Sequence, residues 1–145
     1  MHFEGSIIVH APAERAWEVY RDVVGWPRWT ASITSVELLD PGPLRVGQRA
    51  RVHQPKLPVA VWTVTELTEG RHFRWMSTAR GLRTTGAHVV TPTADGSCRV
   101  TAIVDQEGPL GWLVAMAYRR LTNRYLDWET AGLKRFVEAG VQAVG

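Results

Sequence analysis

Hydrophobic and polar positions along this chain follow two periods, and the changes between them divide the sequence into elements. Residues Phe3–His10, "FEGSIIVH", become apolar and β-branched toward their end and predict a first strand. Residues 11–23 change to helical spacing and predict a helix. Its apolar stripe consists of Ala13, Ala16, Trp17 and Tyr20. Gly25 and Pro27 end this helix, and "GWPRWTASI" indicates a second short one.

Six further strands are predicted between residues 33 and 108. Their segments are 33–40, 48–54, 59–70, 72–81, 82–96 and 97–108. Asp95–Gly96 is a strong hairpin signal between the last two segments. Because the segments are joined by short turns, the pattern favours an antiparallel meander over a parallel α/β sheet.

Residues 108–144 close the chain and predict one long helix, with Pro109 near its start. Its apolar stripe consists of Leu110, Leu113, Val114, Ala117, Leu121, Tyr125 and Trp128. A helix with such a stripe must bury it against something large. The antiparallel sheet is the large apolar partner that the pattern offers. We therefore expect an α+β fold, with two short helices between the first and second strands.

Size and charge narrow the picture further. The 145 residues predict a single domain covering 1–145. The net charge of +3 is mild and the basic residues are scattered, so we expect no nucleic-acid partner. Cys98 is the single cysteine, which fits a reducing compartment. No signal peptide or long apolar run is visible, so we expect a cytoplasmic protein without stable membrane insertion, either a monomer or a homodimer.

The segment "IIVHAPAERAWEVYRDVVGWPRW" resembles the opening of the START-like (SRPBCC) superfamily, in its polyketide cyclase/dehydrase-like and related lipid-binding branch. "GQRARVHQP", "WTVTEL", "RHFRWMS" and "ADGSCRVTAIVD" are similar to its later strands in order and spacing. The matching positions are structural ones: Pro12, Trp17, Asp22, Pro27, Trp29 and Gly96. The resemblance implies a helix-grip fold, a curved seven-stranded antiparallel sheet wrapped around a long C-terminal helix. It also implies an apolar cavity between sheet and helix.

Strong catalytic motifs are absent from the sequence. There is no G-x-S-x-G, H-E-x-x-H, P-loop or G-x-G-x-x-G, and no two histidines have metal-ligand spacing. We therefore expect neither a metal nor a cofactor. His88 is judged alone, and strand parity places it on one face with Gly86. Neither face of this strand is clearly apolar, so parity leaves open whether His88 faces a cavity or solvent.

Parity and helical spacing also select residues for a cavity wall. On the strands these are Gln54, Trp62, Phe73, Trp75, Gly86, Ala102 and Gln106. For Trp62, the opposite choice of face, with Val61 inward, is nearly as plausible. On the terminal helix they are Leu113, Met116, Ala117, Arg120, Leu121, Arg124 and Tyr125.

Three hypotheses about function follow from these residues and the resemblance. The leading hypothesis is a protein that binds a hydrophobic or aromatic small molecule and acts as a polyketide cyclase/dehydrase-like enzyme. In it, His88 or Tyr125 moves a proton and Arg120 or Arg124 stabilises an enolate. The competing hypothesis is a non-catalytic carrier of a lipid, quinone or other hydrophobic metabolite. A protein-interaction module is a third hypothesis, and it requires an exposed apolar patch in place of a deep cavity.

Overall fold

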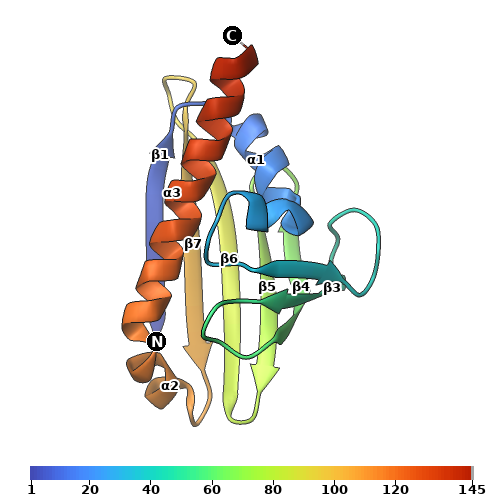
Figure 1. Ribbon diagram of the computed structural model, residues 1–145, viewed down its shortest axis with the longest axis vertical. Helices are drawn as coiled ribbons and strands as arrows, with labels where there is room; N and C mark the ends of the chain where they lie inside the picture. The colour runs from blue at the N-terminus through green and yellow to red at the C-terminus, as the bar shows by residue number, and fades with distance from the viewer. Residues whose placement is uncertain (145) are drawn as a thin grey trace.

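The structure is a computed structural model that describes residues 1–144, with side chains through residue 140. The chain forms one seven-stranded sheet. Figure 1 shows the helices that cover one face of this sheet. The elements in chain order are β1 (His2–Val9), α1 (Ala13–Arg21), the 3-10 helix η1 (Val23–Arg28), β2 (Ser35–Leu38), β3 (Arg49–His53), β4 (Ala60–Thr68), β5 (His72–Ala79), β6 (Leu82–Pro92), β7 (Cys98–Glu107), α2 (Gly111–Ala117) and α3 (Arg119–Val144). The predicted α+β fold, its seven strands and the two short helices after the first strand are confirmed.

The sheet is antiparallel throughout and has the strand order β1-β7-β6-β5-β4-β3-β2. Strands β2 to β7 form the predicted meander, whereas β1 joins the sheet at its other edge beside β7, with Phe3 opposite Val104. Figure 1 shows that β3 runs across the direction of β6 and β7. The sheet therefore curves around the helices, and a curved sheet leaves room that one helix does not fill.

The hairpin between β6 and β7 has the turn that the sequence predicts. Gly96 adopts a φ of 83°, a left-handed conformation that favours glycine. The Asp95 carboxylate accepts hydrogen bonds from the Thr93 hydroxyl at 2.6 Å and the Ser97 N–H at 3.1 Å. These bonds fix the register in which His88 lies opposite Ala102 on β7.

Helices α1 and α3 bury their apolar faces on the concave side of the sheet. The buried face of α1 consists of Ala13, Ala16, Trp17 and Tyr20, the stripe that the sequence predicts. Helix α3 crosses β1 and β7 (Figure 1). A Cβ atom placed on Gly5 of β1 would lie 3.4 Å from Leu126 Cβ of α3, so the helix and this strand are in close contact.

The predicted long C-terminal helix is confirmed as α3, but the prediction that one helix covers residues 108–144 is wrong, because α2 and α3 are separate. Helix α2 ends at Ala117, and the N–H of its C-cap residue Tyr118 still bonds to the Val114 carbonyl at 3.0 Å. Helix α3 begins at the next residue, Arg119. Helix α2 turns its small residues Gly111 and Ala115 toward the core. A Cβ atom on Gly111 would lie 3.3 Å from the Gln106 carbonyl carbon, so only small residues fit against β7 here.

The break changes which side chains face the sheet. Leu110, Leu113 and Trp128 of the predicted stripe are exposed. The buried face of α3 keeps Tyr125 of that stripe and also contains Leu126, Glu129, Thr130, Leu133 and Val137. A single phase carried through residues 108–144 therefore predicts the wrong buried face for much of this region.

Within the described residues, none of the helices combines the length and apolar character that crossing a membrane requires.

Candidate functional site: a cavity beneath the terminal helix

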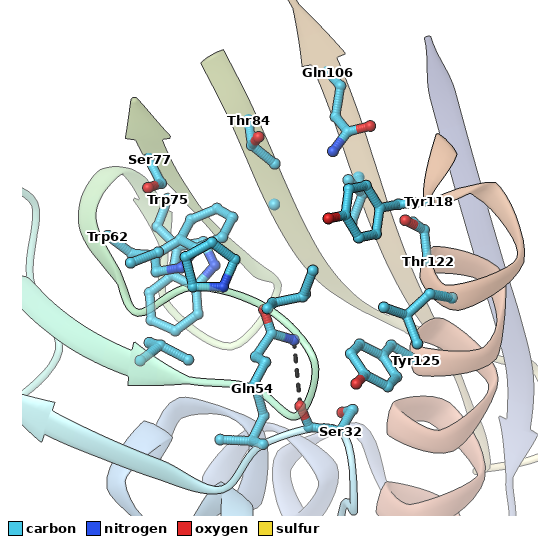
Figure 2. Close-up of a pocket in the computed structure, with 18 of the residues that line it drawn as sticks. Ser32, Gln54, Trp62, Trp75, Ser77, Thr84, Gln106, Tyr118, Thr122 and Tyr125 are labelled. Carbon is cyan, nitrogen blue, oxygen red and sulfur yellow. Dashed lines mark hydrogen bonds between the residues drawn. The ribbon is translucent and has the colours of Figure 1, made fainter. Parts of the chain in front are cut away.

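A cavity of about 470 Å³ lies between the curved sheet and α3. Its volume falls within the range of small-molecule sites, which is about 300–1,000 Å³. Three indole rings, those of Trp26, Trp62 and Trp75, form much of the apolar wall. The rings of Trp62 and Trp75 pack side by side, with their centroids 5.5 Å apart (Figure 2).

Polar side chains gather at the end of the cavity next to α2. Figure 2 shows Ser77, Thr84 and Gln106 on neighbouring strands, opposite Tyr118 and Thr122 at the junction of the two helices. The Gln106 Oε1 atom is buried and has no hydrogen-bond partner among the described residues. A buried acceptor without a partner is costly, so a donor on a bound molecule would relieve it.

At the opposite side the polar groups are already paired. The Gln54 amide donates to the Ser32 carbonyl at 3.3 Å (Figure 2). The Tyr125 hydroxyl donates to the Pro55 carbonyl in the loop between β3 and β4. Burial raises the pKa of Tyr125, although the nearby Arg124 charge works in the other direction. The hydroxyl proton of Tyr125 thus holds the loop between β3 and β4 against α3. Catalysis by Tyr125 would need this same proton.

His88 faces α3 and is 5% exposed, which resolves the alternative that parity left open. It packs among aromatic rings, stacked on Phe73 with 4.5 Å between ring centroids. Its Nδ1 atom lies 3.3 Å from the Tyr20 hydroxyl and 3.4 Å from Glu129 Oε2. The Tyr20 hydroxyl lies 2.6 Å from the same Glu129 oxygen.

These distances determine the tautomer of His88. The Tyr20 hydroxyl has one proton and donates it to the Glu129 carboxylate in the short bond. Its oxygen can then only accept from His88, so Nδ1 carries the ring proton. With the proton on Nδ1, the neutral form of the ring has its lone pair at Nε2. That atom is buried and has no partner among the described residues.

Tyr20 remains a proton donor in this cluster over the whole neutral pH range. Burial and then the charge of Glu129 raise the pKa of its hydroxyl well above the ordinary value. The arrangement Tyr20–Glu129–His88 thus resembles, in its chemistry, a histidine base that a carboxylate orients.

The structure brings eight of the predicted site residues to the cavity wall. They are Gln54, Trp62, Trp75, Gly86, His88, Gln106, Leu121 and Tyr125. On β4 the inward face includes Trp62, whereas Val61 is exposed.

The other seven predicted residues do not line this cavity. Phe73 and Ala102 are on the inward face of the sheet, but other side chains separate them from the cavity. Tyr20 packs on Phe73. Ala115 and Leu126 pack with Ala102. The remaining five are exposed on α2 and α3 because the break at Tyr118 changes the helical phase: Leu113, Met116, Ala117, Arg120 and Arg124.

Sequence reasoning missed Glu129 and did not connect Tyr20 with the site. A signal for Glu129 was present, because it lies four residues after Tyr125 and four before Leu133. A carboxylate within an apolar helical stripe is unusual and indicates a buried partner. Tyr20 was predicted as buried, but its contact with Glu129 spans 109 residues and has no local signal.

Among the side chains that the structure describes, no group of three or more His, Cys, Asp or Glu residues could hold a metal ion.

Residues 1–138 match the family described as polyketide cyclase / dehydrase and lipid transport. The chain belongs to this family. A candidate polyketide cyclase from Streptomyces halstedii is 32% identical over 76 residues, and the match covers 52% of this chain and 59% of that protein. The chain thus matches little more than half the length of this curated relative.

Solved structures share the fold of this polyketide cyclase/dehydrase and lipid transport family member at low sequence identity. A hypothetical protein from Helicobacter pylori gives a TM-score of 0.81 at 15% identity, over 94% of this chain and 88% of that one. A START superfamily protein from Mycobacterium smegmatis gives 0.75 at 18% identity, over 95% and 97%. The predicted START-like resemblance is confirmed, and at these identities the matches establish the fold alone.

Proposed function

We propose that the chain binds a hydrophobic or aromatic small molecule in the cavity and catalyses its cyclisation or dehydration, as a polyketide cyclase/dehydrase-like enzyme. The observation that carries this proposal is the buried His88 on the cavity wall. Its Nδ1 atom is held by Tyr20 and Glu129, and its Nε2 atom is unpaired. The family and the Streptomyces halstedii relative support the same class of reaction.

The chemistry is an intramolecular aldol reaction of a carbonyl-rich chain. His88 Nε2 takes a proton from a carbon between two carbonyl groups, and Glu129 stabilises the resulting imidazolium. The enolate carbon attacks a second carbonyl of the same chain and forms a carbon–carbon bond. The alkoxide recovers the proton from His88, and loss of water then gives the double bond. The cavity contributes by holding the chain in a folded conformation.

The oxyanions of this reaction need donors, and the expected arginines are not placed to supply them. Arg120 and Arg124 are exposed on α3. Hydroxyl and amide donors that line the cavity, on Thr84, Gln106 and Tyr118, are the candidates for this role. Neutral donors stabilise an oxyanion when they are preorganised and water is excluded.

A non-catalytic carrier is the second candidate function. The exposure of Arg120 and Arg124 and the largely apolar wall favour it, because a carrier needs only apolar surface and a few polar contacts. The carrier differs from the enzyme in one respect, since it does not need His88 to accept a proton.

Two measurements test the proposal. Native mass spectrometry of the purified protein, followed by extraction, identifies a retained ligand and its chemical class. Turnover is then measured with a linear β-polyketone thioester, through the absorbance of the aromatic product. His88→Gln should lower kcat by about 10²–10⁴-fold while ligand binding persists.

Tyr125→Phe is the matched control, because its hydroxyl is engaged with the Pro55 carbonyl. We expect its kcat to stay within a few-fold of wild type. Turnover that survives in His88→Gln would exclude His88 as the base and favour the carrier. Loss of turnover in Tyr125→Phe alone would transfer the role to Tyr125.

A further inference from the structure

Helix α2 presents large apolar side chains to solvent at one end of the molecule. Trp112 is 66% exposed and Leu113 is 57% exposed, and Leu110 and Met116 are exposed as well. Their spacings of three and four residues make these side chains neighbours on the helix surface. Single exposed apolar residues are ordinary, but a contiguous group of large ones marks an interaction surface. Leu110, Trp112, Leu113 and Met116 are called the α2 patch below.

The fold fixes the α2 patch beside the hairpin between β5 and β6. The Leu110 N–H donates to the Gly81 carbonyl at 2.8 Å, and a Cβ atom placed on Gly81 would lie 2.9 Å from Leu110 Cγ. Figure 1 shows α2 and this hairpin at the same end of the molecule. Helix α2 packs on the core through the buried Gly111 and Ala115, so the patch cannot turn inward without losing that packing.

The cavity opens at this same end. Val59, Arg80 and Tyr118 line the cavity and are also exposed, so its opening lies among them. Tyr118 directly follows α2, and Arg80 belongs to the hairpin that contacts Leu110. A surface that covers the α2 patch therefore also faces the opening.

The charge of the chain is concentrated beside the α2 patch. Residues 108–126 contain no acidic residue and carry +3, from Arg119, Arg120 and Arg124. This equals the net charge of the whole chain, so the remaining residues are balanced. Arg80 in the adjacent hairpin is also exposed. Among the side chains that the structure describes, the ion pairs use other arginines, so these four guanidinium groups are free to bind an anionic partner.

We propose that the α2 patch and its flanking arginines dock on the surface of an anionic phospholipid bilayer. The contact is peripheral: Trp112, Leu113 and Met116 enter the boundary between headgroups and acyl chains, and the arginines pair with lipid phosphates. An indole suits this boundary because its ring is apolar and its N–H is polar. A second copy of the chain fits less well, since it would bring the same positive charges together.

The position of the cavity opening favours a bilayer over an acidic protein as the partner. Docking at this end brings the opening against the lipid, and the cavity wall behind it is largely apolar. A hydrophobic ligand then passes between bilayer and cavity without crossing water. This inference goes beyond the proposed function, because it holds whether or not His88 acts as a base.

The test is co-sedimentation of the full chain with sucrose-loaded vesicles. Vesicles of phosphatidylcholine alone are compared with vesicles that contain about 30% phosphatidylserine, and we expect the anionic vesicles to bind at least about ten-fold more strongly. Raising the salt concentration should weaken this binding, because salt screens surface charges. Equal binding to both vesicles would overturn the proposal. Binding to neither would overturn it too, and would leave an acidic protein as the partner that the charges fit.

Trp112→Ala tests the apolar part of the contact. Removing the largest exposed side chain of the patch should lower the partition into anionic vesicles by about ten-fold. Phe136→Ala is the matched control, because Phe136 is also an exposed aromatic residue but lies seventeen residues after the start of α3. It should bind as wild type does. A Trp112→Ala protein that also binds as wild type does would contradict the proposal.

A pair of double variants tests whether the position of the charges matters. Arg119→Gln with Arg120→Gln should lower binding to anionic vesicles by about ten-fold or more. Arg15→Gln with Arg135→Gln removes the same charge from exposed positions on α1 and on α3 beyond the patch, and it should change binding by only a few-fold. Equal losses in both proteins would show that net charge alone is responsible and would overturn the assignment to this surface.

Discussion

Tyr20 connects a buried carboxylate with a buried histidine, and it does so through one hydroxyl group. The hydroxyl donates to Glu129 at 2.6 Å and lies 3.3 Å from His88 Nδ1. Removing it would leave the Glu129 carboxylate without its short bond in a site with little access to water. A single oxygen atom thus contributes to stability and to the state of the candidate base.

Tyr20→Phe should lower the free energy of unfolding by about 1–3 kcal/mol at neutral pH, the range for a hydrogen bond to a charged group. Because burial and Glu129 raise the pKa of Tyr20 above its ordinary value of 10.0, the unfolded chain releases this proton first. Wild-type stability should therefore fall as pH rises through about 10, and the gap to Tyr20→Phe should narrow.

Urea unfolding at about pH 8 and about pH 10.5, on either side of the tyrosine pKa, measures both effects. Tyr118→Phe serves as the control because Tyr118 is 41% exposed. A gap between wild type and Tyr20→Phe that stays constant across this range would contradict the assignment.

For single residues, the sequence predicted which side chains face inward only where a charged neighbour on the same strand has to face solvent. Trp75 was placed correctly because Arg74 has to face solvent. His88 could not be placed, since Gly86, Ala87 and Val90 are all buried and lie on both faces of β6. In the structure His88 lies opposite Phe73 on β5 and 3.4 Å from Glu129 on α3, and neither contact is visible in the local sequence of β6.

At the scale of elements, α3 is held against the rest of the fold by a backbone approach that needs glycine. A Cβ atom on Gly132 would lie 1.9 Å from the Trp29 carbonyl oxygen, in the segment after η1. This contact sets the distance between α3 and the segment that follows η1.

Gly132→Ala should destabilise the protein by about 2–3 kcal/mol, because the helix or the Trp29 segment must move. Gly140→Ala, on the same helix but in open space, should be neutral or stabilising by up to about 1 kcal/mol. Chemical denaturation of the two variants beside wild type measures the difference. Similar stabilities for both variants would show that the close approach is not required.

A second contact fixes α3 to the end of β1. The Glu138 carboxylate accepts from the His10 N–H at 2.9 Å and from Lys134 Nζ at 2.7 Å, and Lys134 also donates to the Ile8 carbonyl at 2.8 Å. Burial works to raise the pKa of Glu138, but these two donors lower it overall from the ordinary value of 4.5.

Glu138→Gln should lower the free energy of unfolding by about 1–2 kcal/mol at neutral pH. Since the pKa of Glu138 is lower in the folded state, its contribution is complete above pH 4.5 and is lost as pH falls through the folded pKa. Urea titrations of wild type and variant should therefore converge in acid. Curves that remain parallel down to about pH 3, below the usual glutamate range, would be inconsistent with this ion pair.

The elements themselves were largely predictable, and the exception is instructive. Alternation and turn residues indicated every strand, because one face of each strand packs against helices or a neighbouring layer. The break at Tyr118 has no glycine or proline to mark it. It depends on the narrow space between α2 and β7, which a helical period cannot reveal.

At the scale of the whole molecule, the fold encloses a cavity of about 470 Å³ that its own side chains do not fill. A ligand that binds only the folded state adds to stability by mass action, by about 2.7 kcal/mol at a hundred times its Kd. Protein purified with a retained ligand should therefore have a higher Tm than the same protein after unfolding, dialysis and refolding. Calorimetric scans of both samples, with ligand content checked by native mass spectrometry, make the comparison.

The place of β1 in the sheet has a consequence for how the chain folds during synthesis. Its partner strand is β7, so the backbone pairing of Phe3 with Val104 cannot form until β7 has been synthesised. The remaining strands can pair with neighbours in the order in which they leave the ribosome, but β1 is without its partner until most of the chain has been made. Pairing across such a long loop carries a high entropic cost and slows folding. Among the seven strands of this sheet, β1 is thus synthesised before the others and is among the last to complete its pairing, and α3, which packs on it, follows β7 in the chain.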